Sequence, residues 1–427
     1  MSNNSSQSYK VPFIMMVVLF FLFGFLTNFN GQLQGPIKEV FNLSNLQTSL
    51  LTFAFFTAFV ITGAPASGLI RKYGNKKTLV IALLVIAVAL GIFLTAANIV
   101  SFTVFVLGSF ILGAGITILQ VVANPYLAAL GSPETAGTRI NLAGGFNSLA
   151  GTLAPLIASK FVFDGTPTVD DVKIPYIALT VFAIVLALVF NFLSLPEISA
   201  AGEDDSKEEK LEGNAFQFRH LTLGVLAIFC YVGAEVAIGN NITLYLRSLL
   251  PAGSTEEGIK AWKEAAGMMA TLYWGGLMVG RFVGSSIFQN ANAKTALASV
   301  SALALIFTLG GVVLGGEYNL TTVEIFGQKF GIISNFGVFS LVLVGLFHSV
   351  MWGYIFGLAI NGIGKYTKQG SGYLIMGIFG GALVPFIQSG LADHLSWKVT
   401  FLFVALCHAY LLYYALIGSK PNKVDAA

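Results

Sequence analysis

The sequence predicts an all-α integral membrane protein with twelve transmembrane helices in two six-helix pseudo-repeats. Three observations support this fold class: the composition, a series of long apolar runs, and an internal repeat. Of the 427 residues, 56% are hydrophobic and 10% are charged, whereas soluble domains carry about 25% charged residues. In water such a chain would expose more apolar surface than soluble monomers tolerate, which excludes a soluble enzyme, a disordered tail and a secreted disulfide scaffold.

Apolar runs long enough to span a bilayer occur twelve times along the chain, bounded by polar residues, Gly or Pro. They cover residues 12–34, 47–70, 78–97, 101–129, 138–162, 174–195, 221–249, 263–288, 294–315, 333–362, 371–391 and 397–418. The one long hydrophilic connection, rich in Glu, Asp and Lys, lies between the sixth and seventh runs. We therefore expect an N-terminal six-helix bundle at 1–195, a cytoplasmic linker at 196–219 and a C-terminal six-helix bundle at 220–427.

The Lys and Arg residues divide unevenly between alternate loops. Fifteen of the 23 fall on the side of the N-terminus and of the central linker. Because cytoplasmic loops carry the excess of Lys and Arg, both termini and the linker are expected in the cytoplasm, with the protein in the plasma membrane, which is the inner membrane of a bacterium. The net charge of +3 is small and scattered, so no nucleic-acid partner is expected.

An internal repeat relates the two halves. Four residues recur at an offset of 217: Gly63, Asn75, Lys77 and Thr78 return as Gly280, Asn292, Lys294 and Thr295. A second match relates residues 151–159 to 381–389, and the larger offset fits a longer loop around Glu317 to Lys329. Both matches fall at equivalent helices, which indicates a duplicated six-helix unit.

Six longer motifs carry a family resemblance. They are Gly115–Pro125, Asn141–Ser148, Tyr231–Gly239, Tyr273–Arg281, Ser349–Phe356 and the segment from Gly370 to Asp393. With these motifs the chain resembles the fucose/galactose/glucose symporter family of the major facilitator superfamily, and most of all its glucose/galactose branch. The resemblance covers nearly the whole chain. It implies the major facilitator fold, with a neutral hexose bound between the two halves.

The chain departs from the fucose branch at positions that matter for coupling. Where that branch has an Asp in the first helix, Gly31 follows Asn30, and where it has a Glu in the fourth helix this chain has Gln120. The Gln that the family usually carries in the fifth helix is replaced by Gly144. Proton coupling through the two acids of the fucose symporters therefore does not carry over.

Polar side chains at mid-helix depth are costly in hydrocarbon and usually face a bundle interior or a wet cavity. In the N-terminal half they are Thr27, Asn30 and Gln34 in the first run, Thr117, Gln120 and Asn124 in the fourth, and Asn147 in the fifth. The spacings of three and four place each triplet on one helix face. Amides both donate and accept hydrogen bonds, as sugar hydroxyls do, so these residues are candidates for sugar binding. The alternative is that they bond one helix to another.

The second half offers further candidates for the sugar site: Asn240, Asn241, Trp352, Asn361 and Gln388. The Trp352 ring could stack on the C–H face of a sugar, or serve helix packing. His348, one turn earlier, is interpreted as a packing residue.

Glu235 is the candidate for ion coupling, because it is the one carboxylate predicted near mid-membrane. It is expected to hold a proton, to bind sodium together with Asn240 and the carbonyl of Gly239, or to be neutralised by a protein partner. The sequence leaves these three roles open. Arg281, near the cytoplasmic end of its helix, is interpreted as a snorkelling or latching residue.

The motifs also limit the classes of function that the chain could have. A phosphate-binding loop is missing from the sequence and its four His lie in separate segments, so neither a primary pump, nor an enzyme, nor a cofactor is expected. The favoured hypothesis is a secondary active transporter of a neutral hexose, coupled to protons or sodium. An uncoupled sugar facilitator and a non-transporting sugar sensor are the alternatives. The expected partners are the sugar, the coupling cation and membrane lipid, with the protein a monomer.

Overall fold

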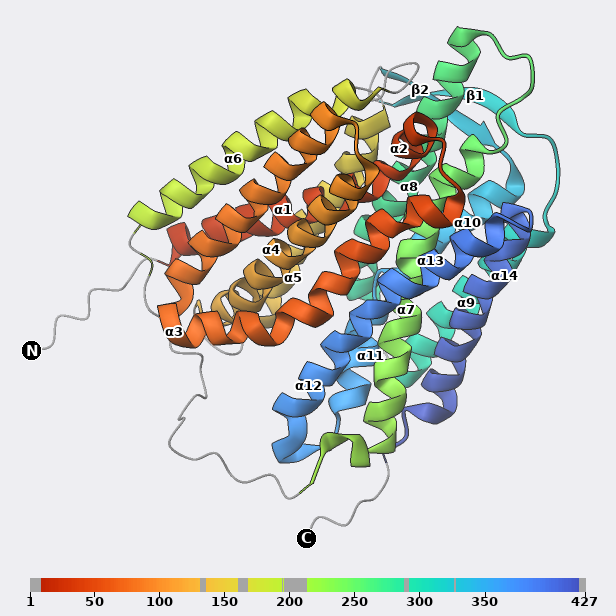
Figure 1. Cartoon of the computed structure of the whole chain (residues 1–427). Helices are drawn as coiled ribbons and strands as arrows, with labels where there is room; N and C mark the ends of the chain where they lie inside the picture. The colour runs from red at the N-terminus through yellow and green to blue at the C-terminus, as the bar shows by residue number, and fades with distance from the viewer. Residues whose placement is uncertain are drawn as a thin grey trace, which may run out of the picture.

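The computed structural model describes residues 9–130, 136–159, 168–193, 195, 213–287, 292–325 and 328–421. The N-terminal half is built from α1 (Lys10–Gln32), α2 (Gln34–Phe41), α3 (Asn45–Ile99), α4 (Phe102–Ala129), α5 (Ala136–Ile157) and α6 (Lys173–Phe192), with the short helix η3 (Val169–Val172) before α6 (Figure 1). Most of the predicted linker, residues 196–212, lies outside the described residues.

The C-terminal half begins with η4 (Ala215–Gln217) and packs beside the first (Figure 1). Its longer elements are α7 (Arg219–Arg247), α8 (Glu256–Ile287), α9 (Ala293–Val313), α10 (Phe336–His348), α11 (Met351–Ile360), α12 (Thr367–Met376), α13 (Gly380–Ala392) and α14 (Trp397–Tyr413). The short helices η5 (Gly364–Tyr366), η6 (Gly377–Phe379) and η7 (Tyr414–Gly418) join or extend them.

Each of the twelve predicted ranges overlaps a helix within the described residues, and the all-α membrane fold class is confirmed. Within the described residues, nine helical segments are long and apolar enough to cross a bilayer, and α10 with α11 forms a tenth across a bend of 43°. In α5 the apolar stretch Leu142–Ile157 is shorter. The first turn of α8 is polar because it carries Glu256 and Glu257.

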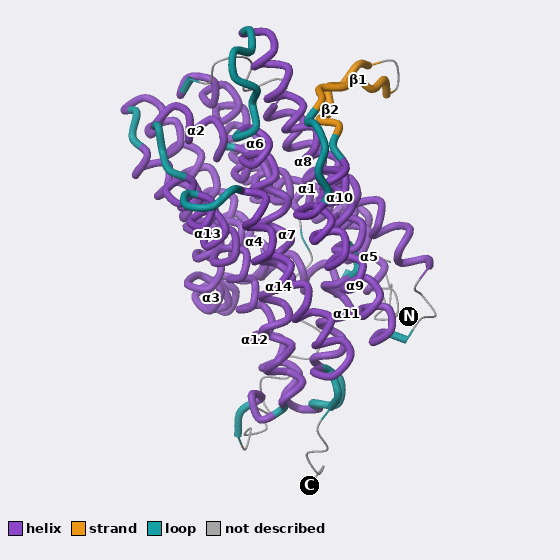
Figure 2. The backbone as a smooth tube through the Cα atoms, turned by 90° about the vertical axis from the view of Figure 1, so that its right-hand side faces the viewer, coloured by secondary structure: helices purple, strands orange, loops and turns teal. Residues whose placement is uncertain are grey.

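The second and third predicted helices form the two arms of α3, which Figure 1 shows as a sharply bent helix. The kink falls at Gly74. Gly74 has φ +77°, a conformation that glycine adopts without the strain of a side chain. The expected loop around Glu317 to Lys329 contains an antiparallel hairpin, β1 (Asn319–Ile325) and β2 (Gln328–Ser334), that stands out beyond the helices (Figure 2). Its β-branched residues favour strand pairing over an irregular loop.

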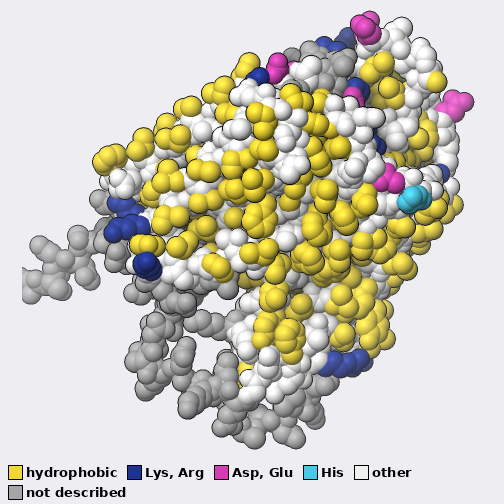
Figure 3. Space-filling model, in the orientation of Figure 1, with side chains coloured by type: hydrophobic (Ala, Val, Ile, Leu, Met, Phe, Trp, Pro, Cys, Tyr) yellow, Lys and Arg dark blue, Asp and Glu magenta, His cyan; other side chains and the backbone are white. Residues whose placement is uncertain are grey.

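The surface matches a bilayer environment. In Figure 3 apolar side chains cover the middle of the molecule, and every Asp and Glu visible on that face lies in its upper half. Large apolar side chains such as Phe192 and Ile174 are 81% and 79% exposed. Hydrocarbon accommodates such side chains at no cost, so the exposed apolar surface marks the lipid-facing region.

Candidate functional site

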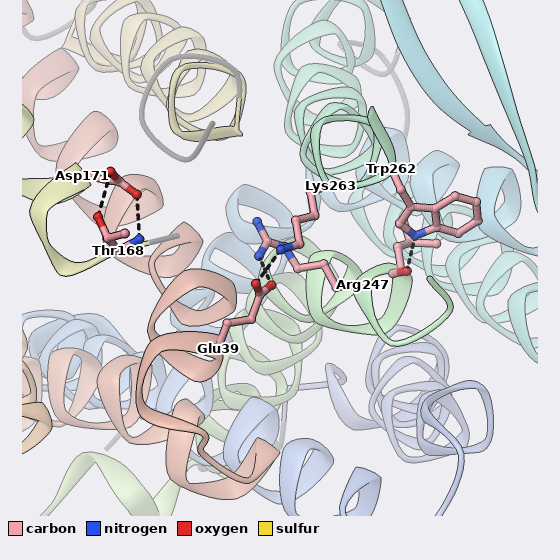
Figure 4. Close-up of polar contacts among 7 residues, drawn as sticks. Glu39, Thr168, Asp171, Arg247, Trp262 and Lys263 are labelled. Carbon is pink, nitrogen blue, oxygen red and sulfur yellow. Dashed lines mark hydrogen bonds and ion pairs between the residues drawn. The ribbon is translucent and has the colours of Figure 1, made fainter. Parts of the chain in front are cut away.

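The two halves are joined by an ionic clasp at the end where α7 stops and α8 starts. Glu39 of α2 accepts from Arg247 at 2.7 Å and from Lys263 at 2.5 Å (Figure 4). Gly35 leaves room for the arginine, because a Cβ there would lie 2.9 Å from its Nε atom. One carboxylate of the N-terminal half therefore holds two cations of the C-terminal half.

A second polar contact joins the halves at the same end. The carboxylate of Asp393, the residue after α13, accepts from the backbone N–H groups of Asn45 at 2.6 Å and Leu46 at 2.9 Å. These are orphan donors at the first turn of α3, where the helix dipole also favours a negative charge. This capping contact fastens α13 to the start of α3.

Amide side chains lie between the halves one to two turns from the clasp. The hydroxyl of Thr243 donates to Gln32 at 3.2 Å, from α7 to α1. The Asn240 side chain fills the space beside Gly31, where a Cβ would lie 2.5 Å from its amide oxygen. The crossing of α1 and α7 is therefore lined by polar groups from both halves.

Asn241 and Gln388, both candidates for the sugar site, contact each other inside the C-terminal half. The Asn241 amide donates to the Gln388 side chain at 2.9 Å, and lies 3.3 Å from the hydroxyl of Ser389. Both amide residues are fully buried. This pair bonds α7 to α13.

Several buried polar atoms of this region have no hydrogen-bond partner within the described residues. They are Gln32 Nε2, Gln34 Oε1, Asn240 Oδ1, Trp274 Nε1, Asn241 Oδ1 and Gln388 Nε2. Buried polar groups in folded proteins are nearly all paired, so such a concentration needs an explanation. A ligand that carries both donors and acceptors supplies one.

The polar stripe predicted for the first run falls on α1 at Asn30 and on α2 at Gln34, and it turns towards its own half. Ser109 of α4 donates to Asn30 at 3.0 Å, and Gln34 donates to Thr52 at 2.5 Å. Both residues bond helix to helix, which is the alternative that the sequence left open. Gln32, on another face of the helix, makes the contact across the halves instead.

Residues of α4 and α5 complete the N-terminal side. The Asn147 amide donates to the carbonyl of Phe20 at 3.1 Å and lies against Gly24. Asn124 donates to the backbone of its own helix, at the carbonyl of Gln120, at 3.0 Å. The side chains of Gln120, Asn124 and Asn147 are all half-buried.

Glu235 lies near the middle of α7, about 24 Å from its first residue at 1.5 Å per residue. The Tyr231 side chain, one turn earlier, and the Arg281 side chain of α8 lie in the neighbourhood of this carboxylate. A neighbouring cation is compatible with the protein-partner role and leaves the proton and sodium roles open.

Arg281 does not snorkel to the membrane surface. Its Nη1 atom donates to the hydroxyl of Ser148 at 2.7 Å and lies 3.3 Å from the carbonyl of Gly144. Both acceptors belong to α5, across the interface between the halves. The latch interpretation is the one that agrees with this geometry.

Aromatic rings surround this charged group. Trp352, half-buried, lies 6.3 Å from the ring of Tyr231 and 6.3 Å from that of Phe356. The Trp274 ring fills the space beside Gly239, where a Cβ would lie 2.4 Å from it. Sequence reasoning missed Trp274 as a site residue, although a Trp in the middle of a helix with a glycine facing it was the available signal.

A buried chain of hydrogen bonds runs behind the aromatic rings. The Tyr273 hydroxyl donates to the backbone carbonyl of Glu235 at 3.0 Å and lies 2.7 Å from Nδ1 of His348. The Nε2 atoms of His348 and His408 are 2.8 Å apart, and Nδ1 of His408 lies 3.1 Å from the hydroxyl of Thr308. His348 is thus a buried packing residue whose two ring nitrogens are both hydrogen-bonded, within a polar chain across α7, α8, α9, α10 and α14.

Asn361 lies apart from the other candidates. It is the exposed C-cap of α11, and its backbone carbonyl lies 2.9 Å from the ring of His220 at the start of α7. Asn240 is about 30 Å further along α7 at 1.5 Å per residue. The structure therefore does not bring Asn361 to the amide layer.

Comparison with known proteins agrees with this architecture. Residues 15–376 match the Major Facilitator Superfamily. The chain is 37% identical to a glucose/galactose transporter of Brucella abortus over 98% of this chain and 96% of that protein. It is 27% identical to the L-fucose-proton symporter of Escherichia coli over 97% of this chain and 94% of that protein.

Solved structures show the same fold. The crystal structure of the E. coli fucose:proton symporter FucP in the outward conformation has a TM-score of 0.65 and 26% identity, over 96% of this chain and 99% of that one. The inward open xylose transporter XylE of E. coli has a TM-score of 0.68 at 13% identity, over 98% of both chains. With its helix order, its paired halves and these matches, the chain belongs to the Major Facilitator Superfamily, and is a membrane transporter and not an enzyme.

Proposed function

We propose that this chain is a secondary active transporter that carries a neutral hexose, of the glucose or galactose type, by alternating access. The relatives named as glucose/galactose transporters and as a fucose-proton symporter support the substrate class. The sugar lies between the halves, bounded by Gln32, Gln120, Asn147 and Asn240, with Trp274 and Trp352 offering ring faces.

One observation carries this proposal: the unpartnered buried amide and indole atoms around the crossing of α1 and α7. They include donors, such as Gln32 Nε2, and acceptors, such as Asn240 Oδ1. A hexose presents several hydroxyls, each able to donate and accept, and so satisfies both kinds of atom. An apolar or singly charged substrate would leave half of them unpaired.

The Lys and Arg distribution supports a topology with both termini and the linker in the cytoplasm. In that topology the clasp of Glu39, Arg247 and Lys263 closes the extracellular side. The order along α7 is then the coupling carboxylate Glu235, the amide layer at Asn240 and the clasp at Arg247. With the extracellular side closed by the clasp, sugar and ion would leave towards the cytoplasm.

Glu235 is proposed as the coupling site, for a proton or for sodium. A proton needs the carboxyl alone, whereas sodium needs several oxygen ligands, of which the Gly239 carbonyl and the Asn240 amide are the nearest along the helix. Asn240 is five residues from Glu235, and so about 140° away around the helix at 3.6 residues per turn, which favours the proton.

The test is uptake of radiolabelled D-glucose and D-galactose into proteoliposomes of the purified protein, under an imposed proton gradient, an imposed sodium gradient or neither. Accumulation above the outside concentration under one gradient supports coupled transport and identifies the ion. Equilibration without accumulation supports the uncoupled facilitator. Sugar binding without flux supports the sensor, and neither binding nor flux contradicts the proposal.

A further inference from the structure

An open apolar groove lies on the outside of the C-terminal half, where α14 packs against α9 and α13 (Figure 1). Its volume is about 510 Å³, within the range of about 300–1,000 Å³ that ligand sites usually occupy. Leucines supply much of its wall: Leu305 and Leu309 of α9, Leu391 of α13, Leu395 of the loop after it, and Leu402 and Leu406 of α14. The amide residues of the proposed sugar site do not line it, so the groove is a separate feature.

The wall of this groove is suited to hydrocarbon. Among the described residues that line it, Thr400 alone carries a polar side chain. The Thr400 hydroxyl is already paired, because it donates to the carbonyl of Trp397 at 2.7 Å. Leu402 and Leu406 are 45% and 67% exposed, so the groove opens towards the surrounding membrane. Its natural occupant is therefore a hydrocarbon chain and not a polar solute.

The length of the groove matches one leaflet of a bilayer. Along α14 the lining runs from Val399 to Ala409, which is about 15 Å at 1.5 Å per residue. The hydrocarbon core of a bilayer is about 30 Å thick, so one leaflet is about 15 Å deep. The lining starts in the first turn of the apolar span Trp397–Gly418. The groove therefore extends from the membrane surface to about the mid-plane.

Lys398 places a cation at the outer end of the groove. Its Nζ atom donates to the carbonyl of Leu314, the C-cap of α9, at 3.0 Å. Leu314 is about 7.5 Å beyond the lining residue Leu309 along the helix. An ammonium group has three donors, and within the described residues this contact uses one of them. The other two are available to an anion at the level of the lipid head groups.

The acids nearest to this cation along the chain do not neutralise it. The Asp393 carboxylate accepts from the backbone N–H groups of Asn45 and Leu46. Glu317, three residues after Leu314, is exposed, and neither acid forms an ion pair with Lys398 within the described residues. A lipid phosphate is the anion that a membrane supplies directly above its hydrocarbon.

We propose that this groove binds one phospholipid with a negatively charged head group, its acyl chain along α14 and its phosphate at Lys398. In the topology with both termini in the cytoplasm, the lipid belongs to the outer leaflet. Its chain packs against Leu391 in the last turn of α13, the helix that Asp393 fastens to α3. The site is independent of which sugar or ion the protein carries.

The experiment is native mass spectrometry of the purified full-length protein, released from detergent and titrated with palmitoyl-oleoyl phosphatidylglycerol. The readout is the lipid concentration that half-fills the first bound position. Leu402→Trp and Lys398→Gln are the test variants, and Leu188→Trp and Lys173→Gln are the matched controls. Leu188 on α6 is 52% exposed, and Lys173 is already paired with Asp170 at 2.6 Å. The unfolding temperature in detergent reports whether each variant is folded.

Leu402→Trp should raise the half-filling concentration roughly tenfold or more, because the larger ring takes space that the chain needs. Lys398→Gln should raise it roughly fivefold, the typical contribution of one lysine at an anionic lipid surface. Both control variants should match the wild type. Dihexanoyl phosphatidylglycerol, which has the same head group on short chains, should bind the wild type more weakly than the long-chain lipid.

Three results would overturn the inference. Equal affinities in Leu402→Trp and Leu188→Trp would mean that the lipid binds elsewhere. An unchanged affinity in Lys398→Gln would contradict the contact with the phosphate. Equal binding of the short-chain and long-chain lipids would show that an anion binds without the groove. If Leu402→Trp is not folded, Leu406→Trp at the more exposed position replaces it in the same comparison.

Discussion

His348 and His408 point their Nε2 atoms at each other across 2.8 Å in the fully buried interior of the C-terminal half. One nitrogen must carry the proton and the other must accept it. The Tyr273 hydroxyl donates to the Glu235 carbonyl, so Nδ1 of His348 donates to that hydroxyl and its Nε2 accepts from His408. Thr308 then donates to Nδ1 of His408, which fixes the direction of the whole chain.

This direction is measurable by ¹⁵N NMR of the histidine side chains in lipid. His348 should be the neutral Nδ1–H tautomer and His408 the neutral Nε2–H tautomer. A second proton on His348 would set two N–H groups face to face, and a second proton on His408 would remove the acceptor of the Thr308 hydroxyl. The exposed side chain of His394 supplies the reference signal of a solvent-accessible ring. The opposite pair of tautomers, or a charged ring, would contradict the chain as described.

Loss of the ionic clasp should open the end of the molecule that it closes. Glu39→Gln removes two partly exposed ion pairs, each worth up to about 1 kcal/mol. Their loss should raise the ratio of open to closed molecules roughly fivefold to thirtyfold. Spin labels at Thr168→Cys and Thr322→Cys, both exposed and in different halves, report the opening as a longer distance. Glu256→Gln, an exposed acid on α8, is the control and should leave the distances unchanged.

Amide truncation should weaken sugar binding in proportion to the hydrogen bonds lost. Gln120→Ala and Asn147→Ala should each reduce affinity roughly threefold to a hundredfold, since one hydrogen bond is worth about 0.5–1.5 kcal/mol and a stranded partner more. Titration calorimetry of the purified variants measures this. Asn361→Ala, at the far end of α11, is the matched control. Wild-type affinity in both test variants would favour the helix-packing interpretation.

Glu235→Gln should separate sugar movement from its driving force. The variant keeps the size and the hydrogen bonding of the side chain but cannot ionise, so it should exchange sugar across the membrane without accumulating it. Counterflow and gradient-driven uptake in the same proteoliposomes distinguish the two. Accumulation equal to wild type would show that Glu235 is not the coupling site.

The proposed topology is tested by labelling cysteines in intact cells. Thr322→Cys in β1 should react with a membrane-impermeant maleimide added outside, and Ser206→Cys in the linker should not. The native Cys230 and Cys407 are buried and give a low background. Ready labelling at Ser206→Cys from outside would reverse the orientation.

The helices were predictable because the bilayer imposes length and apolarity on each span, and both are local properties of the sequence. The rotation of each helix was not, because it depends on close packing at small residues. The spacing of Asn30 and Gln34 identified a polar face, yet that face turns towards α3 and α4, and Gln32 faces α7. The contact of His348 with His408 joins residues on separate helices, so no local pattern indicates it. Asn361 lies outside the proposed site because helix α11 ends just before it.

The hairpin of β1 and β2 is an asymmetric feature that would help to align particles of this small membrane protein in electron microscopy. Seven paired positions hold its two strands in register, and β2 rests on α8 through Gly331, whose added Cβ would lie 3.5 Å from Ala265. A 45.4 kDa helical bundle offers little contrast inside a detergent micelle. An antibody fragment that binds β1 would provide a fiducial for particle alignment. Such a fragment would be attached to the C-terminal half through the contact of β2 with α8, away from the proposed sugar site.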